Sequence, residues 1–283
     1  MTNRNLRIND APLLLNRYRP LRILARGGSS SVYRGRDEIL GRDVAIKLFN
    51  AGALADVRKQ QEELRLLASL SHHGVVAVID AGIDDSTPAD PRPFIVMELV
   101  RGLTVRQAIS ERQLSAREIG EIGFEIAEVL EYIHHRGVIH SDITPSNIML
   151  VDYGTQHSRS RARLTDFGIS IDTLTRKNYI DGLAGTITYM SPEQATSRPL
   201  GPASDIYSLG LVLIECFTRE PVFPGTAVSS AVARLSQDPE IPSWVDAHLS
   251  PVLASMTERE PSHRPTAGEL IEALRTALRG SEY

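Results

Sequence analysis

Short runs rich in β-forming or apolar residues, bounded by Gly or polar turns, occur along the first hundred positions of the chain. Such runs predict β-strands. One stretch, at about 54–70, has apolar residues at helical spacing instead and predicts a helix. A loop rich in Pro and Asp is expected at 84–93. The predicted strands are 18–25, 31–36, 43–49, 75–79 and 94–99.

The apolar period lengthens to three or four residues in the rest of the chain, which predicts helices. A capping box at 115–118 begins one helix, which should end in the basic turn before Gly137. The nearly all-apolar stretch around 210–217 predicts a second helix, buried on most sides. Another capping box, at 266–269, predicts the start of the last helix.

The change of period divides the chain into two parts and predicts an α+β fold. A small β-rich lobe with one key helix is expected at 18–100, and a larger, mostly helical lobe at 101–283. Residues 1–17 are expected to be an N-terminal extension.

Charge and cysteine content exclude several classes of protein. The chain has 31 basic and 35 acidic residues, a net charge of −4, and no long basic run, so non-specific binding to nucleic acid is not expected. Its one cysteine, Cys216, cannot form an intrachain disulfide. No apolar run approaches the length of a transmembrane helix, and we expect a cytoplasmic protein with no transmembrane segment in this chain.

Lysine is scarce, because only Lys47, Lys59 and Lys177 are lysines among the 31 basic residues. A lysine kept in an arginine-rich chain can be required for its compact charge, which the wide guanidinium of Arg does not reproduce. Lys47 is the lysine of interest, because it lies in a predicted strand one hairpin after the Gly- and Ser-rich turn at 24–32. Backbone N–H groups of such a turn and a nearby ammonium group can hold phosphates. An ordinary hairpin and a solvated lysine are the alternatives.

Two polar segments of the second part can supply carboxylate and amide oxygens. Asp142 and Asn147 lie five positions apart in a loop after the capped helix, and Asp166 follows a predicted strand. The carboxylate of Asp142 could accept a proton from a hydroxyl group, and the oxygens of Asn147 and Asp166 suit Mg²⁺ better than zinc. Two unrelated Asx turns are the alternative for either motif alone.

Taken together and in this order, the motifs resemble those of the eukaryotic-like (Hanks-type) Ser/Thr protein kinase family, and most closely its bacterial branch. The family signatures are a Gly-rich loop, V-A-I-K, a helical Glu, H-R-D-x-x-x-x-N, D-F-G, A-P-E and a late Arg. Their counterparts here are 25–32, 44–47, Glu63, 140–147, 166–168, 191–193 and Arg264.

The resemblance implies a bilobal protein kinase-like fold and an enzyme that transfers the γ-phosphoryl group of Mg-ATP to Ser or Thr hydroxyls of proteins. Its cofactors would be ATP and Mg²⁺, with Mn²⁺ as the alternative cation. The implied catalytic residues are Asp142, the base, with Lys47, Glu63, Asn147 and Asp166. Asn147 and Asp166 would hold the metal. The implied nucleotide-binding residues are Ala25, Arg26, Gly27, Gly28, Val32, Ala45, Lys47, Met97, Glu98, Val100 and Met149.

Two further roles follow from the resemblance. Glu193 would pair with Arg264 in a structural ion pair, and His140 would pack in an apolar spine rather than transfer protons. The protein substrates would carry Ser or Thr acceptors, with a weak preference for Thr from Ile169. Autophosphorylation would fall on Ser170, Thr173 or Thr175, and a homodimer is compatible with the family.

Four positions depart from the family pattern. Ala25 and Ser30 replace glycines of the Gly-rich loop. Ser141 replaces the Arg of H-R-D, so activity should depend little on phosphorylation of the activation segment. Thr144 replaces a Lys that contacts the γ-phosphate, and this loss of a cation should lower the rate. The departures keep a second hypothesis open, a pseudokinase or nucleotide-binding scaffold with weak or no transfer. A phosphotransferase acting on small molecules is a third.

The gap between Asn147 and Asp166 is long for the family and contains a basic stretch at 157–163. A solvated surface loop is the simpler interpretation of this stretch. Docking of an acidic partner is the alternative.

Overall fold

The computed structural model describes residues 13–28, 30–50, 68–86, 91–154, 159–166 and 187–280. The chain divides into two units, with a boundary between Val100 and Arg101. A short segment, His72–Val75, belongs with the second unit although it precedes this boundary. Each unit is built around its own sheet or helices, and the two are described in turn.

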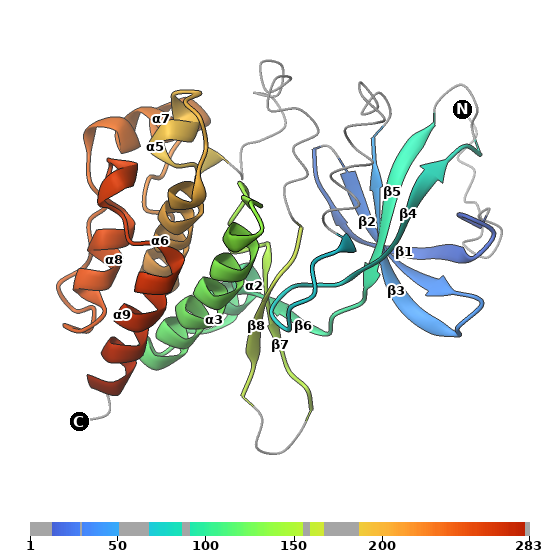
Figure 1. Cartoon of the computed structure of the whole chain (residues 1–283), viewed down its shortest axis with the longest axis horizontal. Coiled ribbons are helices and arrows are strands. Elements are labelled where there is room, and N and C mark those ends of the chain that lie inside the picture. The colour runs from blue at the N-terminus through green and yellow to red at the C-terminus, as the bar shows by residue number, and fades with distance from the viewer. Residues whose placement is uncertain are drawn as a thin grey trace. The chain divides into compact units, whose positions relative to one another are not determined.

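The first unit contains a five-stranded antiparallel sheet with the strand order β1-β2-β3-β5-β4 (Figure 1). Its strands are β1 (Tyr18–Arg26), β2 (Ser30–Asp37), β3 (Arg42–Phe49), β4 (Val78–Asp84) and β5 (Arg92–Glu98). Strands β1, β2, β3 and β5 confirm four of the strands predicted from the sequence. The predicted helix at 54–70 falls almost entirely outside the described residues.

The position of β4 corrects the sequence prediction of a strand at 75–79. Val75 and Val76 are buried, but they lie before the strand, and Val75 makes only an isolated bridge to Leu164. The strand itself continues through Gly82 to Asp84, into the predicted loop. Val75 and Val76 are therefore apolar because they are buried in the connection before β4. The strand itself forms because it pairs with β5, in spite of the weak strand propensity of its Asp and Gly residues.

Alternation along β3 explains why the sheet is buried on both faces. Val44 and Ile46 pack in one apolar cluster with Tyr18, whereas Ala45 and Phe49 belong to a second cluster. Neighbouring side chains of a strand point to opposite faces, so one strand contributes to both clusters. The second cluster also includes Val32, Met97 and Val100, so together with Ala45 it holds four of the predicted nucleotide-binding residues.

The second unit is helical, with a small sheet of strand order β6-β7-β8 (Figure 1). Its helices are α2 (Val105–Glu111), α3 (Ala116–His135), α5 (Pro192–Ala195), α6 (Pro202–Thr218), α7 (Ala227–Ser236), α8 (Ser250–Met256), η3 (Pro261–His263) and α9 (Ala267–Gly280). Its strands are β6 (Gly102–Thr104), β7 (Ile148–Val151) and β8 (Arg161–Leu164). The capping boxes predicted for α3 and α9 are confirmed by their hydrogen bonds.

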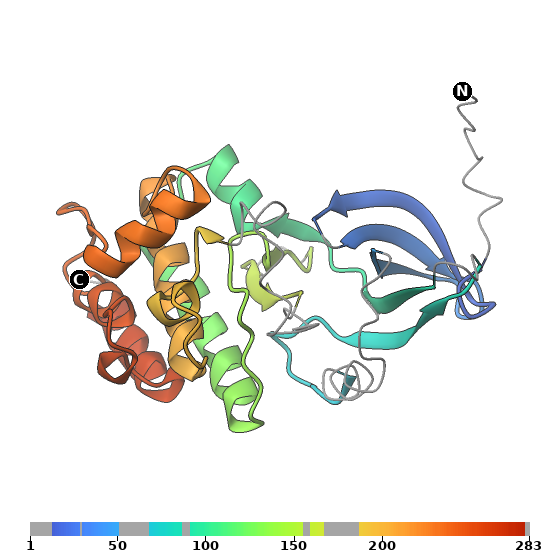
Figure 2. The same ribbon diagram turned by 90° about the horizontal axis from the view of Figure 1, so that it is seen from above.

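Helices α3, α6 and α9 form the core of the second unit, and α3 lies alongside α9 in both views (Figures 1 and 2). Gly123 of α3 permits this close packing, because a Cβ atom there would lie 2.8 Å from Leu213 of α6 and 3.3 Å from Leu274 of α9. Helix α6 is buried over nearly its whole length, as its apolar sequence predicts.

Candidate active site

The turn between β1 and β2 retains a compact shape although two of its expected glycines are replaced. The Gly27 N–H donates to the Ser30 carbonyl at 2.8 Å, and the Asn50 side chain donates to the Gly28 carbonyl at 2.8 Å. Ala25 pairs with Val32 directly after a register shift in the β1–β2 ladder. The substitution at Ala25 therefore falls where an ordinary strand residue fits, and Gly27 and Gly28 remain available to approach phosphates.

Lys47 lies in the middle of the first unit's sheet, between Val32 of β2 and Ile95 of β5. Its ammonium nitrogen is 5.5 Å from the ring centroid of Phe49. A central strand fixes the backbone from which this side chain extends. The predicted partner, Glu63, lies outside the described residues, so the pair stays a prediction.

Four of the residues predicted to contact the adenine lie in one apolar cluster of the first unit. Ala45 and Met97 are buried and face each other across β3 and β5, and Val32 and Val100 pack against them. Glu98 ends β5, where its N–H donates to the Ala77 carbonyl at 3.0 Å. The remaining residue predicted to contact the adenine, Met149, belongs to β7 of the second unit.

In the second unit, Asp205 of α6 holds the loop that contains Asp142. The two carboxylate oxygens of Asp205 accept the His140 and Ser141 N–H groups, each at 2.8 Å, and His134 Nε2 lies 2.8 Å from the same carboxylate. Asp205 is 1% exposed. These contacts anchor the loop to the most buried helix of the unit, and the fully buried His140 fits the packing role that we predict for it.

Asn147 is directed at Asp142. Its amide nitrogen donates to the Asp142 carbonyl at 2.8 Å and to the Asp142 carboxylate at 2.9 Å. The bonds fix the carboxylate and turn the amide nitrogen of Asn147 inward. The amide oxygen, the atom that could bind a cation, is therefore directed away from Asp142.

Asp166 reaches the same region through the pairing of β7 with β8. Ile148 pairs with Leu164, and the Thr165 N–H donates to the Asn147 carbonyl at 2.9 Å. Asn147, just before β7, and Asp166, just after β8, therefore lie at the same end of this strand pair. Asp166 has a positive φ of 54°, which is unusual for a residue with a side chain. A carboxylate and an amide oxygen suit Mg²⁺, which keeps several waters or phosphate oxygens of its own.

A small closed pocket, too narrow for a water molecule, adjoins Asp142, and its lining includes residues that the sequence did not predict. Its lining is Ser141, Asp142, Ile143, Tyr189, Met190, Gln194 and Ser208. The Gln194 side chain donates to the Ser141 carbonyl at 3.0 Å, and the Ser208 hydroxyl donates to the Tyr189 carbonyl at 2.7 Å. The capping box between Ser191 and Gln194 was the available sequence signal, because it fixes the start of α5 beside this pocket.

Tyr189 also belongs to a buried polar network that the sequence did not predict. Its hydroxyl donates to Glu215 of α6 at 2.5 Å, and Arg106 of α2 contacts both side chains. Burial, together with the Glu215 charge, raises the pKa of Tyr189 above its usual range. The network fixes Tyr189 from two helices, α2 and α6, and neutralises Glu215 with Arg106.

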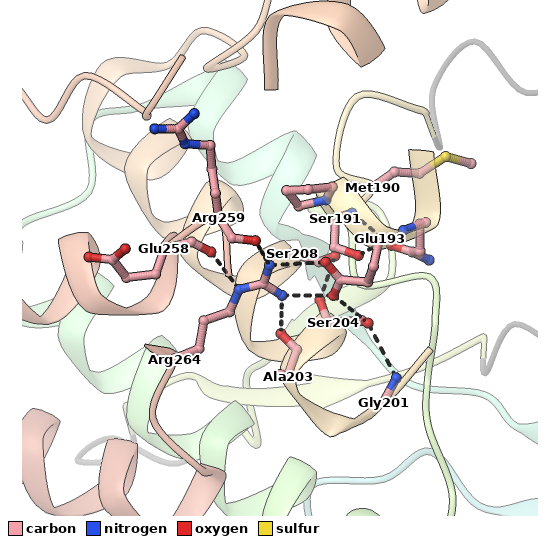
Figure 3. A network of polar contacts seen from close by, with 12 residues as sticks. Met190, Ser191, Glu193, Gly201, Ala203, Ser204, Ser208, Glu258, Arg259 and Arg264 are labelled. Carbon is pink, nitrogen blue, oxygen red and sulfur yellow. Dashed lines mark hydrogen bonds and ion pairs between the residues drawn. The ribbon is translucent and has the colours of Figure 1, made fainter. Parts of the chain in front are cut away.

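The predicted ion pair between Glu193 and Arg264 is confirmed (Figure 3). Two guanidinium nitrogens of Arg264 donate to the two Glu193 oxygens at 2.7 and 3.0 Å, and the Ser204 hydroxyl also donates to Glu193 at 2.7 Å. Arg264 further donates to the carbonyls of Ala203, Glu258 and Arg259. The pair therefore ties α5 to the start of α6 and to the loop before η3.

The basic stretch before β8 is neutralised within its own unit. In its described part, Arg159 pairs with Glu121 and Arg161 donates to Glu125 at 2.5 Å. Glu125 is 4% exposed and also accepts the Ala162 N–H at 2.6 Å. These arginines connect the segment around β8 to α3. Because both are already paired with glutamates, two fewer cations remain for the alternative, the docking of an acidic partner.

Comparisons with known proteins agree with the order of the motifs. The family model described as "Protein kinase domain" matches residues 18–274. The serine/threonine-protein kinase PknB of Mycobacterium tuberculosis is 36% identical over 270 residues, which cover 91% of this chain and 42% of that protein. A probable serine/threonine-protein kinase of Streptomyces coelicolor is 34% identical over 271 residues, covering 91% of this chain and 39% of the relative.

The chain thus spans less than half the length of these relatives. Among the residues that the structure describes, no helix combines the length and the apolar character needed to cross a bilayer.

Proposed function

The chain belongs to the protein kinase family, and we propose that it transfers the γ-phosphoryl group of ATP to Ser or Thr hydroxyls of protein acceptors. One observation carries this proposal. The Asp142 carboxylate accepts a hydrogen bond from the Asn147 side chain, so a potential general base is held in a fixed position. A scaffold would not require a carboxylate fixed in this way.

Each residue of the proposed site has a distinct task. Asp142 accepts the proton of the acceptor hydroxyl as the oxygen attacks phosphorus. Lys47, oriented by Glu63, holds the phosphates under the turn at 27–30. Asn147 and Asp166 would hold Mg²⁺, with Mn²⁺ as the alternative, and such a cation would neutralise charge on the phosphates.

The nucleotide base would bind in the first unit. The cluster of Val32, Ala45 and Met97 offers an apolar surface to the adenine, and the backbone at Glu98 and Val100 lies at the end of β5 to recognise its edge. Met149 completes this set in the proposal. The proposed phosphorylation sites Ser170, Thr173 and Thr175 lie outside the described residues.

Contacts within the second unit hold the backbone at Ser141, the position at which the family has an Arg. Its N–H is bound by Asp205 and its carbonyl by Gln194, both within the second unit. Neither contact involves a phosphate group. We therefore expect the loop that contains Ser141 and Asp142 to be ordered in the unphosphorylated protein.

The experiment is a transfer assay with labelled ATP and Mg²⁺, with and without a generic protein acceptor. Wild type is compared with Asp142→Asn and Lys47→Met. The proposal predicts label on the acceptor with wild type and a loss of at least about a thousandfold in Asp142→Asn. Nucleotide binding without transfer by the wild type would instead establish the scaffold.

A further inference from the structure

Arg234 of α7 is a fully buried cation in the second unit. It is 0% exposed and is the largest of the fully buried side chains that the structure describes. Burial lowers the pKa of its guanidinium group, because the charged form has lost its water. Such a side chain needs a compensating arrangement of acceptors.

The acceptors of Arg234 are carbonyl groups and one hydroxyl. Its Nε donates to the Ser230 carbonyl at 3.0 Å, and one terminal nitrogen donates to the Ser230 hydroxyl at 2.6 Å. The terminal nitrogens also donate to the Thr188 carbonyl, at 3.1 Å, and to the Met190 carbonyl. The guanidinium carbon is 5.5 Å from the ring centroid of Phe223.

No carboxylate in the described ranges forms an ion pair with Arg234. Arg264 offers a direct contrast, because it is equally buried but has the bidentate partner Glu193. A buried charge without an opposite charge is costly, and a packed apolar residue of similar volume would avoid that cost. The presence of Arg234 is therefore better explained by what it holds than by stability alone.

What Arg234 holds is the segment 188–190, which lies next to Asp142. Tyr189 and Met190 line the same small closed pocket as Asp142. Arg234 binds the carbonyls on either side of Tyr189, and the Ser208 hydroxyl binds the carbonyl of Tyr189 itself. Three consecutive carbonyl groups are thus fixed by side chains of α6 and α7.

We propose that Arg234 is a positioning residue for the acceptor site: its guanidinium group holds segment 188–190 in the conformation that receives the protein acceptor beside Asp142. The inference rests on the proposed function, since it places the acceptor beside Asp142. It adds a residue that belongs to no family motif named above and that touches neither the nucleotide nor the acceptor.

Lysine at this position separates positioning from charge. A guanidinium group has five N–H donors in a flat fork and bridges acceptors that lie apart, whereas an ammonium group is a single point of charge. Arg234→Lys keeps the charge but loses the simultaneous contacts to residues 188 and 190. Arg234→Met removes the charge at similar length.

The test measures the KM for a protein acceptor and the KM for ATP in both variants. The control Val232→Ala alters an exposed residue of the same helix, and Arg264→Lys alters a buried arginine outside the pocket. We expect Arg234→Lys and Arg234→Met to raise the KM for the acceptor at least tenfold and to change the KM for ATP less than twofold. Val232→Ala should change neither. Hydrogen exchange should quicken at residues 187–190 in both Arg234 variants, and remain unchanged there in Val232→Ala.

The outcomes separate this inference from the proposed function. Wild-type protein that transfers no phosphoryl group overturns both. Active wild type with an unchanged acceptor KM in Arg234→Lys and Arg234→Met overturns the inference alone. A rise of both KM values together, with a melting temperature lowered as far as in Arg264→Lys, assigns Arg234 a purely structural role and also overturns it.

Discussion

Two residues of the proposed site, Ser141 and Asp166, have a left-handed backbone, with φ of 63° and 54°. This conformation costs a residue with a side chain of the order of 1 kcal/mol, so the surroundings must impose it. Asp205 supplies the constraint at Ser141, and the pairing of β7 with β8 supplies it just before Asp166. The motif spacing identified these two positions, but their residue types did not indicate a strained backbone. Gly is the residue that usually adopts the left-handed conformation, whereas these residues are Ser and Asp.

Among the positions that depart from the family pattern, Thr144 has the clearest expected effect on the rate. It is 7% exposed and lies between Asp142 and Asn147, where a cation would face the transferred group. We expect Thr144→Lys to raise kcat about tenfold, because an additional positive charge stabilises the transition state. Steady-state kinetics at saturating ATP measure this. Thr144→Met is the control for side-chain length, and an unchanged or lower kcat in Thr144→Lys contradicts the assignment.

Lys47 allows a test of the argument from lysine scarcity. We expect Lys47→Arg to lose at least about a hundredfold in kcat/KM, because the wide guanidinium group does not reproduce the compact ammonium contact with the phosphates. Lys59→Arg is the matched control and should keep full activity. Retention of wild-type activity by Lys47→Arg would show that any cation suffices there.

At the scale of elements, the sequence predicted those that have a complete local signal. Helices α3 and α9 begin at capping boxes, and β1, β2 and β3 are short runs of β-forming residues between turns. The sequence prediction placed β4 too early, because Val75 and Val76 are apolar and buried but lie before the paired strand. The contacts among α2, α6 and residue 189 were missed because Arg106, Glu215 and Tyr189 lie far apart in sequence, and no local pattern joins them.

The Glu193–Arg264 pair that ties α5 to α6 gives a prediction with a defined sign in pH. Burial alone would raise the pKa of Glu193, but hydrogen bonds from Arg264 and Ser204 outweigh it and hold the pKa below its ordinary value. A carboxylate with a lowered folded-state pKa stabilises the protein above its unfolded pKa of about 4.3, and loses this contribution as the pH falls through the folded value.

Glu193→Gln should therefore lower the free energy of unfolding at pH 7 by about 3–5 kcal/mol, since it leaves Arg264 buried without an opposite charge. The difference between wild type and variant should shrink as the pH is lowered from 5 to 3. Urea unfolding at each pH measures it, and the exposed Glu272→Gln is the control. A difference that stays constant over this range would contradict the lowered pKa.

At the scale of the whole molecule, nucleotide binding should change the stability of the folded protein. A ligand that binds only the folded state stabilises it by mass action, by about 2.7 kcal/mol at one hundred times its Kd. Nucleotide binding should therefore be visible as a rise in melting temperature.

We expect saturating Mg-ATP to raise the Tm by about 5 °C or more. ATP with a chelator should give a smaller rise. Asp166→Asn should lose the increment due to Mg²⁺ while keeping the rise due to ATP alone, because it removes a metal ligand and leaves the apolar cluster of the first unit intact. An Asp166→Asn protein with the full increment would remove Asp166 from the metal site.

The central claim is that Asp142 acts on the hydroxyl of a protein acceptor. The most direct measurement is the initial rate of label transfer from ATP to a protein acceptor, by wild type and Asp142→Asn at equal nucleotide occupancy. The account predicts transfer by the wild type and a rate at least about a thousandfold lower in Asp142→Asn, with the affinity for Mg-ATP within a few-fold. Equal rates in the two proteins, or no transfer by a wild type that binds Mg-ATP, would contradict it.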